Sequence, residues 1–148
     1  GQTAFIAGAL AFLIGHAIYA TFFVRAGLGL AALKQAGRLL LTLALLASAA
    51  FSAALLVRHD TMSLVSSAIY TIALTVMVLS SFTLPWTRWL VMLGAVLFFL
   101  SDILLTWHAN KPPSDPLLLR ILSDTSWFTY YFGQLGLCLG ALTLRTRA

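Results

Sequence analysis

The sequence has no glutamate, and its only acidic residues are four aspartates among 148 residues. Charged residues make up 9% of the chain, whereas a soluble domain usually carries about 25%. This scarcity excludes an ordinary soluble globular protein. It accompanies 61% hydrophobic residues and a mean hydropathy of +0.97, and together these values indicate an integral membrane protein.

Cysteine is also scarce. Cys138 is the only one, so the chain cannot form an internal disulfide. HExxH, GxSxG and Walker motifs are absent, as is paired Cys/His spacing for a metal. We therefore expect no metal and no cofactor of the chain's own, although a pigment or haem held within a complex stays open. The net charge of +5 is spread over short connections without a basic block, so we expect no nucleic-acid partner.

Long apolar segments dominate what is present. A spanning helix needs about 20 apolar residues, and a membrane β-strand would show a two-residue alternation that these segments lack. The sequence therefore predicts an all-α, polytopic helical membrane bundle, with residues 1–148 in one transmembrane domain. About five transmembrane helices are expected, at Thr3–Val24, Leu39–Val57, Met62–Leu84, Arg88–Trp107 and Ser123–Leu144.

The connections carry the turn and interface signals. The basic, Gly-containing stretch 25–38 is expected to lie at the membrane interface as a short helix. Residues 84–89 break at a proline and carry two anchoring tryptophans, and residues 108–116 form a proline-containing loop. Leu117 to Leu119 are expected to rest on the interface, and Ser123 or Asp124 to cap the last helix.

The distribution of basic residues predicts the orientation. One side of the predicted bundle holds Arg25, Lys34, Arg38, Arg88, Arg145 and Arg147, and the other holds Arg58, Lys111 and Arg120. Positive residues favour the cytoplasmic side, so we expect a cytoplasmic C-terminus and a multi-pass protein of the bacterial inner membrane.

Asp102 is the residue whose presence most needs a reason. It follows Ser101 inside the apolar stretch 91–107, five residues before Trp107 and hence about 7–8 Å deep. A carboxylate at the centre of a spanning helix costs roughly 2.5–3.5 kcal/mol on insertion scales. A partner, a water-filled cavity or protonation must offset that cost, and a protonated carboxyl group can serve as a general acid.

The last predicted helix brings Tyr130, Tyr131 and Gln134 to roughly 10–16 Å depth on the same side. They could be polar contacts between helices, with Asp102 accepting a tyrosine hydroxyl, or they could line a polar pocket around this carboxyl. In the first helix, His16 and Tyr19 share a face. They could form contacts with other helices, or they could line a substrate cavity. His16 lies deeper than Asp102, which disfavours a direct pair.

Three stretches together resemble the YhhN family of polytopic membrane proteins, which includes the lysoplasmalogenases. They are GALAFLIGHAIYATFF at 8–23, LGAVLFFLSDILLTW at 93–107 and TYYFGQLGL at 129–137. The features that match are His and Tyr near a Gly/Phe-rich start, a Ser-Asp pair, and Tyr with Gln in the last helix. The family typically has about eight helices, one of them bearing an acidic residue before the His-Tyr helix. Either about three N-terminal helices are therefore missing here, as we expect, or this chain is a shortened member.

The resemblance implies an intramembrane hydrolase that cleaves the vinyl ether bond of a lysoplasmalogen to a fatty aldehyde and a glycerophospho-headgroup. It implies Asp102 as the catalytic acid or base, and His16, Tyr19, Tyr130, Tyr131 and Gln134 as substrate-binding residues. The expected partners are a lysophospholipid substrate and membrane lipids. Two alternatives stay open: a non-enzymatic subunit of a larger membrane complex, and a small proton-coupled lipid or solute carrier.

Overall fold

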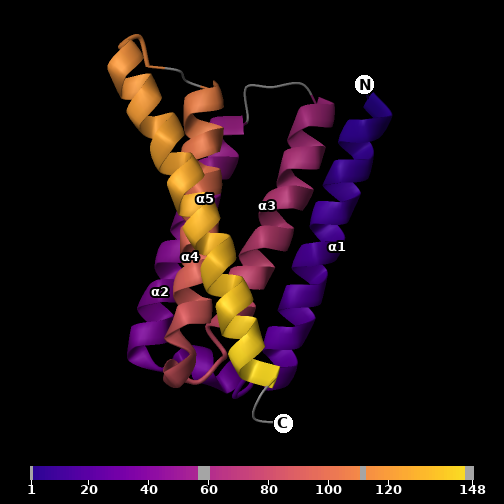
Figure 1. The fold of residues 1–148 in the computed structure, drawn as a ribbon, viewed down its shortest axis with the longest axis vertical. Helices are drawn as coiled ribbons and strands as arrows, with labels where there is room; N and C mark the ends of the chain where they lie inside the picture. The colour runs from indigo at the N-terminus through magenta and orange to yellow at the C-terminus, as the bar shows by residue number, and fades with distance from the viewer. Residues whose placement is uncertain (1, 57–60, 111–112, 146–148) are drawn as a thin grey trace.

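The computed structural model describes residues 2–56, 61–110 and 113–145, and these form five α-helices and two short 3₁₀ helices (Figure 1). The α-helices are α1 (Gln2–Ala26), α2 (Ala36–Leu56), α3 (Thr61–Ser81), α4 (Trp89–Asn110) and α5 (Pro116–Arg145), and the 3₁₀ helices are η1 (Leu30–Lys34) and η2 (Trp86–Arg88). The all-α prediction is confirmed.

The helices alternate in direction, and each packs on a limited set of neighbours (Figure 1). Helix α1 lies along α3, α5 crosses α4 in close contact, and α2 packs on both α3 and α4. Buried apolar side chains join these elements, with Phe23 of α1, Val78 of α3 and Phe98 of α4 all fully or almost fully enclosed. Helix α4 therefore lies between α2 and α5 and shares the core with α1 and α3.

Among the described residues, two helices are long and apolar enough to cross a membrane by length and composition, within the segments Ala36–Ala53 and Trp86–Trp107. The shorter apolar segments Leu10–Ala26 and Ala68–Ser81 belong to α1 and α3. Many large apolar side chains on the outside of the bundle are exposed, including Ile18 and Leu40. Such an exterior is expected where lipid, rather than water, is the solvent.

The predicted start of the last helix is wrong. Helix α5 begins at Pro116, so Leu117 to Leu119 already belong to this helix. Proline is favoured in the first turn of a helix, where its missing N–H would have no partner. Asp115 supplies the cap, because its Oδ1 accepts a hydrogen bond of 2.9 Å from the Leu117 N–H.

The predicted cap at Ser123 or Asp124 is therefore also wrong. Both residues lie inside α5, where backbone N–H groups already have helical partners. Asp124 instead lies 3.8 Å from the Arg120 Nε, in an exposed pair with i,i+4 spacing. This aspartate belongs to the helix surface.

Glycines allow α4 and α5 to approach closely. A Cβ added to Gly94 would lie 2.6 Å from the Leu137 backbone nitrogen, and one added to Gly133 would lie 2.7 Å from the Phe98 nitrogen. Gly136 and Gly140 face α4 in the same way. In lipid, helices associate largely through such close packing, so this interface holds the two helices in one register.

The connection after α1 packs against the connection after α3. The Leu28 N–H donates to the Thr83 carbonyl oxygen at 2.8 Å, and the η1 helix follows within the stretch that was expected to form a short helix. Gly29, which precedes η1, has φ +81°, a left-handed conformation that favours glycine. These contacts place both connections at one end of the bundle, where Arg25, Lys34 and Arg88 also lie. Arg58, Lys111 and Arg147 lie outside the described residues.

Arg38 is buried rather than directed to lipid headgroups. Its side chain is 1% exposed, its Nη1 donates to the Phe82 carbonyl oxygen at 2.7 Å, and its guanidinium lies 5.0 Å from the Trp86 ring centroid. The acceptor directly follows the C-terminus of α3, where carbonyl groups carry partial negative charge. Arg38 therefore ties the start of α2 to the end of α3.

We expect Arg38→Met to lower the free energy of unfolding by about 1.5–3 kcal/mol, because hydrogen bonds of a charged donor contribute in that range. Methionine keeps much of the side-chain volume but cannot donate to Phe82. The measurement is an SDS-unfolding titration of the purified protein in detergent micelles. Arg25→Met is the matched control, since Arg25 is exposed at the same end, and a loss of equal size in that variant would contradict the prediction.

Candidate functional site

Asp102 lies on α4, and its carboxyl group faces α3. The Tyr70 hydroxyl of α3 donates a hydrogen bond to this carboxyl group. The second carboxyl oxygen, Oδ2, is enclosed by protein and has no hydrogen-bond partner among the described residues. Because burying a polar atom without a partner is unfavourable, an enclosed and unpaired carboxyl oxygen indicates a place for water or a ligand group.

A small cavity lies at this carboxyl group, between α2, α3 and α4. Its volume is about 20 Å³, which is close to the space that one water molecule needs. Five of its eight lining residues have polar side chains, but most of the surface that lines the cavity is apolar. The polar lining residues are Ser52, Tyr70, Thr71, Asp102 and Thr106.

A cluster of aromatic rings surrounds Tyr70 and connects it to α1 and α5. The Phe12 ring stacks on Tyr70 with 4.3 Å between centroids, and His16 lies 3.8 Å from Phe12. Phe98 lies 5.3 Å from both His16 and Tyr130. These contacts fix the Tyr70 ring, so the direction of its hydroxyl towards Asp102 is set by packing.

His16 is buried within this cluster and reaches Asp102 only through other side chains. Its Nδ1 donates to the Phe12 carbonyl oxygen at 2.8 Å, one turn earlier in α1. In the part of the chain that the structure describes, its ring forms no ion pair with Asp102. The arrangement agrees with the expectation that these two residues do not form a direct pair.

The other predicted substrate-binding residues lie in different parts of the bundle. Tyr130 lies in the aromatic cluster, as described above. The Tyr19 hydroxyl lies 3.9 Å from the Cys138 Sγ, and it joins α1 to α5 rather than to the cavity. Tyr131 is 63% exposed and stacks on Trp127, and Gln134 is half-buried further along α5. A role in substrate binding stays a prediction for all of them.

Tyr70, the direct partner of Asp102, was not among the residues predicted from the sequence. A signal was present, because Tyr70 is the one tyrosine in its apolar segment and lies about a dozen ångströms from the start of that helix. That depth is comparable with the depth of Asp102. The sequence alone does not determine that α3, rather than α5, turns its tyrosine towards the carboxyl group.

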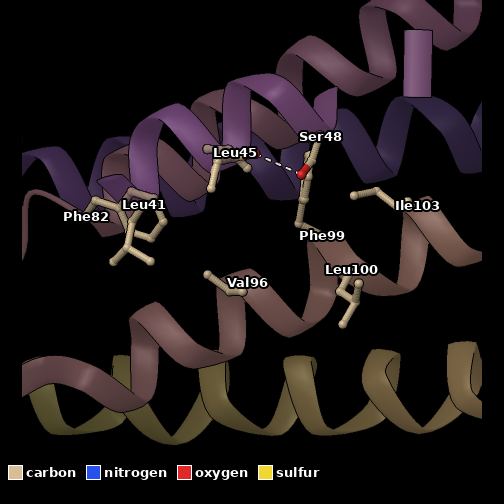
Figure 2. A pocket seen from close by; sticks show the side chains of 9 residues that line it. Leu41, Leu45, Ser48, Phe82, Val96, Phe99, Leu100 and Ile103 are labelled. Carbon is tan, nitrogen blue, oxygen red and sulfur yellow. Dashed lines mark hydrogen bonds between the residues drawn. The ribbon is translucent and has the colours of Figure 1, made fainter. Parts of the chain in front are cut away.

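A second, larger opening lies between α2 and α4 (Figure 2). Its volume is about 170 Å³, and almost all of its lining is apolar. Two of its lining residues, Phe99 and Ile103, also line the small cavity at Asp102. The two spaces therefore adjoin.

The fold and the site define a helical membrane bundle with one carboxyl group enclosed beside a water-sized cavity. Among the described residues, no group of three His, Cys, Asp or Glu side chains could hold a metal ion. The chain belongs to the YhhN family, which it matches over residues 1–141. This family of polytopic membrane proteins includes lysoplasmalogenases. No curated protein and no solved structure matches the chain.

Proposed function

We propose that this protein hydrolyses the vinyl ether bond of lysoplasmalogens, with Asp102 as the catalytic residue. The observation that carries the proposal is that Asp102 lines a cavity that fits one water, while its buried Oδ2 has no partner among the described residues. Membership in a family that includes lysoplasmalogenases supplies the substrate class.

The chemistry requires one proton donor and one water molecule. Protonated Asp102 donates its proton to the vinyl carbon that is not bonded to oxygen, which leaves an oxocarbenium ion at the other carbon. Water adds to that cation, and the Asp102 carboxylate accepts the proton that the water loses. The resulting hemiacetal collapses to a fatty aldehyde and the free hydroxyl group of the glycerophospho-headgroup, so a single carboxyl acts first as acid and then as base.

Tyr70 acts as a positioning residue in this scheme. Its hydrogen bond occupies one side of the carboxyl group, which leaves the other oxygen for proton transfer. Its ring also lines the cavity, and the face of an aromatic ring attracts cationic charge such as that of the oxocarbenium ion. Stacking on Phe12 holds the ring in place.

The proposal is tested by incubating the purified protein in lipid nanodiscs with a 1-alkenyl lysophospholipid in D₂O. We expect release of a fatty aldehyde with one deuterium on the carbon next to the carbonyl, because that carbon receives the proton. Immediate borohydride reduction followed by mass spectrometry would locate the label.

The saturated 1-alkyl analogue is the control, since it has no vinyl carbon to protonate and should stay intact. Absence of aldehyde from the alkenyl substrate would overturn the proposal. Aldehyde without deuterium at that carbon would show that cleavage follows another mechanism.

A further inference from the structure

The larger opening between α2 and α4 is a groove with apolar walls (Figure 2). Leu41 and Leu45 of α2 face Val96 and Leu100 of α4 across it, and Phe82 closes one end. The Ser48 hydroxyl also lines the groove, but it donates to the Ala44 carbonyl oxygen of its own helix at 2.8 Å. The groove therefore suits a hydrocarbon and offers little to a polar ligand.

The volume sets how much hydrocarbon fits. The groove measures about 170 Å³, and an apolar cavity of about 150 Å³ is known to accommodate benzene. About six carbons of an extended chain would therefore fill it. The stretch of α2 from Leu41 to Ser48 is about 10 Å long, which agrees with an elongated rather than a round ligand.

The groove adjoins the cavity at the carboxyl group, with two α4 side chains between them. Phe99 and Ile103 lie in the walls of both spaces, at successive turns of α4 next to Asp102. From there the groove runs along α4 towards Val96, away from the end where α4 meets the connection to α5. Figure 2 shows this order, with Ile103 at one end of the row and Phe82 at the other.

We propose that this groove binds the first carbons of the 1-alkenyl chain, with the vinyl ether bond at Asp102. The proposal rests on the proposed function and adds the direction of the substrate to it. The chain extends from Ile103 towards Phe82, and the headgroup points to the end of the bundle where α4 joins α5. The groove thus limits the length of the chain segment that can bind nearest the reacting bond.

The test introduces larger side chains at two positions along the groove. Ala44→Phe fills its middle, and Leu41→Trp narrows it near the Phe82 end. We expect Ala44→Phe to lower kcat/KM for a sixteen-carbon alkenyl lysophospholipid about tenfold or more, while a four-carbon alkenyl substrate is cleaved as by the wild type. Leu41→Trp should allow cleavage of substrates with longer alkenyl chains than Ala44→Phe allows. Ala50→Phe is the matched control, because Ala50 is exposed on the same helix and does not line the groove.

Native mass spectrometry of the protein with the uncleavable saturated sixteen-carbon ether measures binding without cleavage. This measurement separates the two proposals. Aldehyde release with a chain-length profile unchanged in Ala44→Phe would overturn the groove assignment and leave the proposed function standing. Absence of aldehyde in the wild type, together with ether binding that Ala44→Phe weakens and Ala50→Phe does not, would overturn the function and support the groove. Absence of both aldehyde and binding would overturn both.

Discussion

Replacing Asp102 with asparagine should lower aldehyde release from a lysoplasmalogen by about 10²–10⁴-fold, the usual contribution of general acid–base catalysis. Asparagine has almost the same shape and keeps an oxygen that accepts the Tyr70 hydroxyl, so the packing between α3 and α4 is preserved. It has no carboxyl proton to give to the vinyl carbon. The measurement is the initial rate of aldehyde formation in nanodiscs, together with the thermal unfolding midpoint of the same sample.

The matched control is Asp124→Asn, which makes the same chemical change at an exposed carboxyl group on α5. Its pairing with Arg120 is a surface interaction that contributes little to stability, so both rate and midpoint should stay close to the wild type. An Asp102→Asn protein that folds normally and retains its full rate would remove Asp102 from the mechanism. Loss of the rate together with the fold would instead indicate that the carboxyl group is a structural contact.

Replacing Gly94 with valine should destabilise the bundle by about 1–3 kcal/mol or more, the usual cost of overpacking. The atoms that a new Cβ would meet belong to the α5 backbone at Gly136 and Leu137, so no side chain can rotate away to make room. The two helices would have to separate, and their close contact would be lost along its length. SDS-unfolding titration measures this change directly.

Gly15→Val on α1 provides the comparison, because a Cβ at Gly15 would meet nothing within 4 Å beyond the backbone of its own helix. The described residues leave open space at this position. We expect the unfolding free energy of this variant to stay within about 0.5 kcal/mol of the wild type. Equal losses in the Gly15 and Gly94 variants would mean that glycine itself, rather than the contact of α4 with α5, is responsible.

The sequence by itself determined the class of the protein and singled out one carboxyl group as the candidate for a functional role. Long apolar segments leave helices as the spanning structure, because every backbone N–H and C=O group must be paired without water. The same reasoning singled out Asp102, since a carboxyl group in an apolar segment has an energetic cost wherever its neighbours lie. Motifs around His16, Asp102 and Gln134 resembled the YhhN family, and the family match over residues 1–141 confirmed it.

Only the tertiary structure decided which side chains meet. The sequence places tyrosines at comparable depths on α3 and α5, but the rotation and axial offset of each helix determine that Tyr70 of α3 donates to Asp102. The burial of Arg38 against the end of α3 has the same origin, since it depends on where α2 packs. Cavities are likewise spaces between helices, so no single segment encodes the water-sized space at Asp102 or the apolar groove beside it. Periodicity within a helix fixes which residues share a face, whereas the partner of that face depends on contacts between residues far apart in the chain.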